Sequence, residues 1–274
     1  MDHVIASAGL RLRYLCAHTS IQNLDLPQIA DDLAEPTTRH AMAWWFATAR
    51  FTDFDHVVIA TDCESNRCVA MLVGVDGATG NETFLDLQAG FVVSAMNGSM
   101  LLRRMLAYAI SRISLFGTVP QIVAARTTSP ACYRMLSLFA DIVPGSSVFP
   151  QTDATVVDLR MAGLARRIAR RLSPTSEYDA ATGTIRTNPG TAKTCFARNA
   201  GIEASSHAMF ERNIGTGDQI LVVLDMRQTN RDAITSHAER LVLKRWKGPT
   251  AASRRRVGVS ARPSLPSEAP TLSA

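Results

Sequence analysis

The sequence predicts a mixed α/β fold, because two hydrophobic periods alternate along its first half. Residues 9–16 alternate apolar and polar side chains with the period of two that is typical of a half-buried strand. Residues 102–113 instead repeat apolar side chains at the spacing of one helix face. Strand-like and helix-like segments follow one another up to about residue 140, which is the order of elements in a mixed α/β domain.

The elements of the first half are predicted from these periods and from turn and capping residues. Residues 63–67 are polar and separate two apolar runs, which indicates a hairpin. Ser129 followed by Pro130 is typical of a helix start, with serine as the N-cap and proline at the first helical position. In chain order we expect a strand at 9–16, a helix at 39–50, a hairpin of 56–62 and 68–75, a turn at 77–80, a strand at 83–93, a helix at 98–113, a strand at 120–126 and a helix at 129–139.

The second half predicts a smaller α/β region and a tail. In chain order we expect a strand at 154–159, an arginine-rich amphipathic helix at 161–172, short extended pieces around a turn at 179–183, a buried strand at 219–226 and a helix at 229–246. From residue 249 the chain is rich in Ala, Ser, Pro and Arg, a composition typical of disorder. These patterns divide the chain into a first domain at 1–150, a small α/β region at 151–246 and a disordered basic tail at 247–274.

Charge argues against a nucleic-acid-binding protein. The chain has a formal net charge of +5, and the five basic residues and one acid after residue 246 carry +4 of it. The part expected to fold is therefore nearly neutral, and it predicts no basic patch for a polyanion.

The cysteines and the apolar runs indicate a soluble, cytoplasmic protein. Five cysteines are an odd number, they are spread along the chain, and they have no paired spacing of the kind that zinc needs. We interpret them as reduced thiols and expect no metal site. No apolar run is long enough to span a membrane, and the first residues do not resemble a signal peptide.

The most informative segment is the strand at 83–93 with the small-residue turn and the helix that follow it. A strand that enters a helix through such a turn presents unpaired backbone N–H groups and the positive end of a helix dipole. This arrangement is a ready site for a diphosphate.

On these elements, residues 10–145 resemble the GNAT acetyltransferase superfamily. The hairpin at 56–75 matches the strands expected upstream, and residues 122–133 look like the following strand and helix. The resemblance implies a GNAT-like fold and an acyl-CoA-dependent N-acyltransferase, with acetyl-CoA as cosubstrate and an unidentified amine as acceptor. It also implies that acetyl-CoA contacts the end of the strand and the turn, at Val92, Val93, Asn97, Gly98 and Ser99. Arg103 is the candidate for the 3′-phosphate, with a solvated helix face as the alternative.

The turn departs from the pattern of the superfamily. That pattern has a basic residue or Gln followed by alternating glycines or alanines, whereas this chain offers Gly98 alone. Depending on the alignment, Met96, Met100 or Leu102 occupies a position expected to be small. The alternative function is therefore a non-catalytic GNAT-like binding or scaffold protein that has lost acyl-CoA binding.

Two residues are candidates for catalysis. Period-two alternation places Asp86 and Gln88 on one face of the strand, and an acid there could accept a proton from the attacking amine. The alternative is that Asp86 faces solvent or pairs with an arginine. Tyr133 resembles the tyrosine that protonates the departing CoA thiolate in the superfamily, and a buried tyrosine with a hydrogen-bond partner is its alternative.

Overall fold

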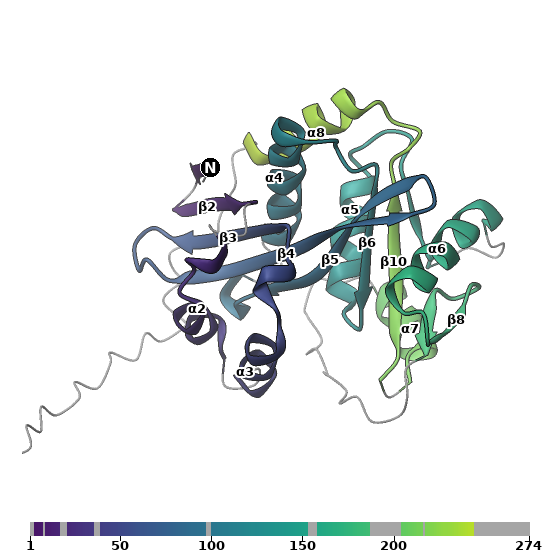
Figure 1. Cartoon of the computed structure of the whole chain (residues 1–274), viewed down its shortest axis with the longest axis horizontal. Coiled ribbons are helices and arrows are strands. Elements are labelled where there is room, and N and C mark those ends of the chain that lie inside the picture. Colours follow the sequence, from purple (N-terminus) through teal and green to yellow (C-terminus); the bar gives the residue numbers. More distant parts are fainter. Residues whose placement is uncertain are drawn as a thin grey trace, which may run out of the picture.

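One mixed sheet organises the chain (Figure 1), and its strands run in the order β1-β2-β3-β4-β5-β6-β10-β9-β8, with β7 also paired to β10. The computed structural model describes residues 3–7, 9–16, 21–35, 39–96, 100–152, 158–186, 204–215 and 217–243. The strands are β1 (His3–Ser7), β2 (Leu10–Leu15), β3 (His56–Asp62), β4 (Cys68–Thr79), β5 (Glu82–Val92), β6 (Ile122–Thr127), β7 (Ser147–Phe149), β8 (Glu177–Asp179), β9 (Thr184–Arg186) and β10 (Gln219–Asp225). The predicted mixed α/β class is confirmed.

Helices cover both faces of this sheet. They are α2 (Leu26–Leu33), α3 (Arg39–Thr48), α4 (Leu101–Phe116), α5 (Pro130–Ala140), α6 (Leu159–Leu172), α7 (Ala204–Asn213) and α8 (Arg231–Leu243), with short 3-10 turns η1 (Phe51–Asp53) and η2 (Ser94–Met96). Buried residues of α4, α5, α7 and α8 form one core with the sheet. On the opposite face, α2 and α3 pack over one part of the sheet and α6 over another.

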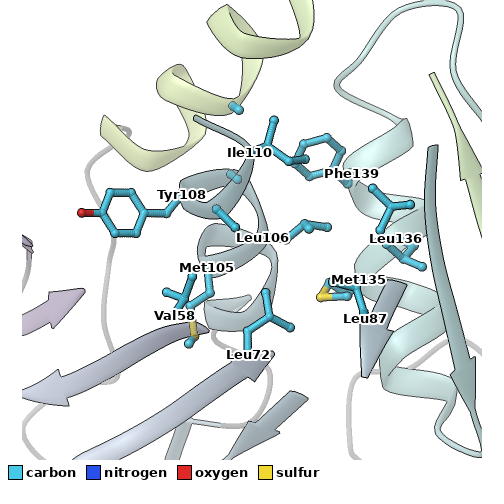
Figure 2. Packing of buried hydrophobic residues seen from close by; sticks show 14 of the residues in the cluster. Val58, Leu72, Leu87, Met105, Leu106, Tyr108, Ile110, Met135, Leu136 and Phe139 are labelled. Carbon is cyan, nitrogen blue, oxygen red and sulfur yellow. The ribbon is translucent and has the colours of Figure 1, made fainter. Parts of the chain in front are cut away.

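The core under α4 is the largest of these clusters. Figure 2 shows Met105 and Leu106 of α4 beside Val58 and Leu72 of the sheet, with Leu136 of α5 close by. Leu106 and Leu136 have no exposed surface. Burying a side chain of this size contributes about 1.5–3 kcal/mol, so this cluster fixes α4 and α5 against the sheet.

A β-bulge in β5 reverses which residues face this core. Val73 pairs with Ala89 and Gly74 pairs with Leu87, so Gln88 has no residue opposite it on β4. Before the bulge, Leu87 faces α4 and α5; after it, Val92 packs against the same core. The one extra residue accounts for the change of parity.

The sheet crosses the division predicted at residue 150. β10 lies antiparallel to β6, with Ile122 opposite Asp225, and Val222 belongs to the same core as Leu106. The division into a first domain and a second region stays a prediction. The predicted tail, residues 247–274, lies outside the described residues.

Several local predictions hold. β3 has the predicted bounds, and the Oγ of Ser129 accepts a hydrogen bond from the backbone N–H of Ala131 at 3.3 Å, as an N-cap does. Four of the described strands and α-helices were not predicted, namely β1, β7, α2 and α7.

Two local predictions are wrong. The turn predicted at 77–80 is strand up to Thr79, and a Cβ at Gly77 would lie 2.4 Å from the ring of Phe84, so glycine there makes room for an aromatic side chain. The strand predicted at 154–159 is wrong at its C-terminal end, because Asp158 is the N-cap of α6 and Leu159 is its first residue. Residues 153–157 lie outside the described residues.

Candidate active site at the divergence of β5 and β6

The parallel strands β5 and β6 pair over only three residues and then part. Their last pair is Leu87 with Ala125, although β5 continues to Val92 and β6 to Thr127. Beyond this pair, β5 is bonded to β4 and β6 to β10. Alternate peptide groups of β5 after Leu87 therefore face an edge with no described strand beside it, and such an edge can bind the amides of an extended ligand.

Asp86 lies at the centre of the sheet, next to this divergence. It pairs with Ala124 of β6 and shares the even-numbered face of β5 with Phe84, on the side that α6 covers. The carboxylate is buried, with 3% of the side chain exposed. Its Oδ1 atom is buried and accepts no hydrogen bond from the described residues, which is uncommon for a buried carboxylate oxygen.

Gln88 and Arg126 surround the other oxygen of this carboxylate. The Gln88 side-chain amide donates to Asp86 Oδ2, and Arg126 Nη2 lies 3.9 Å from the same atom. Arg126 also donates from Nη1 to the backbone carbonyl of Leu172 at 3.1 Å, at the end of α6. The bulge and α6 thus hold an amide and a guanidinium against one oxygen of Asp86.

The environment moves the pKa of Asp86 toward neutrality. Burial penalises the charged form and raises the pKa to about 6, while Arg126 and Gln88 act in the opposite direction. A carboxylate with such a pKa can accept a proton near neutral pH and release it again.

Tyr133 lies on the other face of the sheet. It is 7% exposed and belongs to the core under α4 and α5, where its ring meets Phe210 of α7 edge-on at 6.4 Å. The structure therefore places Tyr133 near the end of β6, at the start of α5, but does not bring it onto the face of Asp86.

The turn after β5 is partly described. Asn97, Gly98 and Ser99 lie outside the described residues. Val92 and Val93 are half-buried at the end of β5, and the Val93 N–H donates to the Val69 carbonyl of β4. The next N–H, that of Ser94, donates to Glu35 Oε1 at 2.6 Å. The backbone N–H of Ser94, at the start of the turn, is thus already hydrogen-bonded to the side chain of Glu35.

The three bulky residues of the turn differ in position. Met96 is buried in the core under α4, and Leu102 packs against the same core. Met100 is 39% exposed and has φ +59°, in the left-handed region, directly before α4. Its side chain is therefore at the surface beside the first turn of α4, where phosphate would have to approach.

Arg103 donates both to α5 and to Met100 beside the turn. Its Nη1 donates to the backbone carbonyl of Leu138 on α5 at 3.3 Å, and Nη2 contacts Met100 Sδ at 3.3 Å. Burial lowers the pKa of Arg103, while Asp141 raises it. Its side chain is thus half-buried between α4 and α5, rather than on a fully solvated face.

Sequence reasoning did not identify Arg126, Glu35 or the bulge as parts of this site. Arg126 is the one charged residue in the apolar run at 120–126, and a charged residue at the end of a buried strand could have indicated a functional site. Nothing in the local pattern marks Glu35, whose partner Ser94 is 59 residues away. In the described part of the chain, no group of His, Cys, Asp and Glu is arranged to hold a metal ion, and no helix is both long and apolar enough to cross a membrane.

Comparison with solved structures finds acetyltransferases. A ribosomal-protein-S5-alanine acetyltransferase from Vibrio fischeri is 8% identical, with a TM-score of 0.36 over 55% of this chain and 89% of that one. The NatC complex bound to Gag peptide and CoA is 16% identical, with a TM-score of 0.30 over 47% and 83% of the two chains. A protein from Desulfovibrio desulfuricans, provisionally assigned to the GNAT acetyltransferases, is 13% identical, with a TM-score of 0.31 over 78% and 99%.

The similar structures cover 47–78% of this chain, and the sequence comparisons find no further relative. No protein-family model matches the chain, and neither does any curated protein. The solved structures to which this mixed α/β chain is similar are acetyltransferases.

Proposed function

We propose that the protein is an acyl-CoA-dependent N-acyltransferase, with acetyl-CoA as acyl donor and an amine as acceptor. The observation that carries the proposal is the position of Asp86. A buried carboxylate with a pKa raised to about 6, one oxygen of which accepts no hydrogen bond from the described residues, lies beside the last residue pair of two diverging parallel strands. Perturbed acids of this kind are enriched at functional sites.

The open edge of β5 fits the donor. Acyl-CoA has an extended arm with two amide groups, and peptide groups of β5 beyond Leu87 have no described strand on the side of β6. Val92 and Val93 end this edge, and η2 follows at Ser94–Met96. When bound there, acetyl-CoA supplies the thioester as acyl donor.

Asp86 acts as the base in this proposal. The ionised carboxylate accepts a proton from the acceptor amine, directly or through water, so that the nitrogen lone pair becomes available for attack on the acyl carbon. Gln88 and Arg126 hold Oδ2 and orient the carboxylate. Tyr133 is proposed as the acid that protonates the departing thiolate; because it lies on the other face of the sheet at the start of α5, it would act from the side opposite Asp86.

A second function is favoured by two other observations. The Ser94 N–H is bound by Glu35, and the surface side chain of Met100 lies beside the first turn of α4. Both restrict the approach of phosphates to the turn. They support a non-catalytic GNAT-like binding or scaffold protein that no longer binds acyl-CoA.

One pair of measurements separates the two functions. Isothermal titration with acetyl-CoA and with CoA measures binding, and release of the CoA thiol in the presence of a panel of amines measures turnover. Binding together with turnover that Asp86→Asn removes, and that the surface variant Asp76→Asn retains, supports the acyltransferase. Absence of binding by the folded protein overturns it and leaves the scaffold function.

A further inference from the structure

A second site on the molecule is an open pocket where the start of α6 meets the residues after β10. The pocket has a volume of about 400 Å³ and is lined by Leu159, Arg160, Gly163, Arg167, Arg227 and Gln228. Small-molecule sites have volumes of roughly 300–1,000 Å³, so the pocket has the size of a small ligand. None of the residues around Asp86 lines it.

Three arginines and two carboxylates form an alternating chain of charges in this pocket. Arg160 Nη1 lies 2.8 Å from Asp225 Oδ2, and Arg227 Nε lies 2.9 Å from Asp225 Oδ1. Arg227 also pairs with Glu82, and Arg167 Nη2 lies 2.7 Å from the second oxygen of Glu82. Three cations face two anions, so the cluster has a net charge of +1.

The two ends of this chain of charges are about half exposed, and the three groups between them are less exposed, with Arg227 at 25%. The side chain of Asp225 is 1% exposed, whereas those of Arg160 and Arg167 are 49% and 51% exposed. Each outer arginine gives one nitrogen to a carboxylate of the described residues and keeps further N–H donors that can reach the pocket. Arg227 pairs with Asp225 on one side and Glu82 on the other, so it is the central residue of this chain of charges.

Gly163 provides the space between the outer arginines. Residues 160, 163 and 167 share one face of α6 by their spacing of three and four. A Cβ at Gly163 would meet nothing closer than Arg167 Nη1 at 4.0 Å. Because the helix has no side chain at this point, the hollow stays open between two guanidinium groups.

We propose that this pocket binds the phosphoryl group of a small phosphorylated molecule. Guanidinium groups bind phosphate through paired N–H donors, and two half-exposed arginines on either side of a hollow present such donors. A net charge of +1 in a pocket of this size suits a small anion rather than a polyanion, which needs an extended basic surface. The site is separate from the proposed acyl-transfer site and does not depend on it.

Titration of the intact protein with inorganic phosphate and pyrophosphate, at low ionic strength with chloride as background anion, tests the proposal. We expect pyrophosphate to bind with a Kd of about 1 mM or tighter. Arg160→Gln and Arg167→Gln should each weaken it about tenfold, since each removes charge-assisted hydrogen bonds. Arg166→Gln is the matched control, because Arg166 is exposed on the same helix but does not line the pocket.

Gly163→Leu keeps every arginine and fills the hollow. We expect it to abolish binding without lowering the Tm, since leucine is a better helix former than glycine and the site has room for a side chain. Absence of pyrophosphate binding by the wild-type chain overturns the proposal. Binding that Gly163→Leu leaves intact, or that Arg166→Gln weakens as much as Arg167→Gln, also overturns it.

Discussion

Asp86 and Arg126 lie on adjacent parallel strands with Oδ2 and Nη2 3.9 Å apart, and only one oxygen of the carboxylate is held by this arginine and by Gln88. The distance is longer than that of a good charge-assisted hydrogen bond. Arg126 therefore lowers the pKa of Asp86 less than burial raises it, and the carboxyl keeps a pKa of about 6.

Asp86→Asn should lower turnover strongly and leave the fold intact. Loss of a general base lowers the rate of acyl transfer about 100-fold or more. The folded state raises the pKa of Asp86 from 3.8 to about 6, so ionisation costs stability, and the stabilising contribution of the protonated form is lost as the pH rises from about 4 to about 6. Relative to the wild type, Asp86→Asn should thus be more stable at pH 7 than at pH 4, by about 3 kcal/mol at most.

Urea denaturation of both proteins at the two pH values measures this difference. A variant that is less stable than the wild type at pH 7 would show that the ion pair with Arg126 stabilises the fold and that Asp86 is structural.

The pH dependence of acyl transfer should follow the ionisation of Asp86. We expect kcat/KM to rise with pH to a plateau, with a midpoint at about 6, because the base is active only when ionised. Arg126→Gln should move this midpoint to higher pH by about one unit, since it removes the charge that lowers the pKa of Asp86. A midpoint that does not move in Arg126→Gln would assign the titration to another group.

Met100→Gly should stabilise the protein and improve the access of acetyl-CoA to the start of α4. Met100 has φ +59°, which costs a residue with a side chain about 1 kcal/mol relative to glycine. Its side chain is 39% exposed, so little burial is lost. We expect a higher Tm and a lower Kd for acetyl-CoA in isothermal titration.

Met96→Ala is the control for Met100→Gly, because Met96 is buried in the core and its truncation should cost about 2–5 kcal/mol of stability. Equal effects of the two substitutions would contradict the surface position of Met100.

Asp225→Asn should destabilise the protein strongly. Burial alone would raise the pKa of Asp225, but hydrogen bonds from Arg227 outweigh it, and the pKa lies below its ordinary value. The stability that this carboxylate contributes is present at neutral pH and is lost as the pH falls below about 4. We expect a loss of about 3 kcal/mol at pH 7, and a smaller one at pH 3, in urea denaturation.

Asp76→Asn, at a carboxylate that is 67% exposed, should cost less than about 1 kcal/mol at either pH. A loss at Asp225 as small as this would contradict a structural role of the buried pair.

Local patterns predicted much of the fold. The alternation of β2, the apolar runs of β3 and β6 and the cap at Ser129 depend on neighbouring residues, so they can be read from short windows. The contacts of Asp86 could not be predicted in this way. Arg126 is 40 residues away, and the bulge at Gln88 interrupts the period on which the face assignment depends. Both follow from tertiary pairing rather than from local propensity.

The pairing of β6 with β10 has a consequence for synthesis of the chain. The edge of β6 that faces β10 is covered only after β10 has been synthesised, because Ile122 pairs with Asp225, which is 103 residues further along the chain. Until then, the nascent protein presents the Val-Ala-Ala stretch of β6 as an unpaired apolar edge, the kind of surface that other chains can join. Closing so long a loop is slow, so folding should lag behind translation and be sensitive to aggregation.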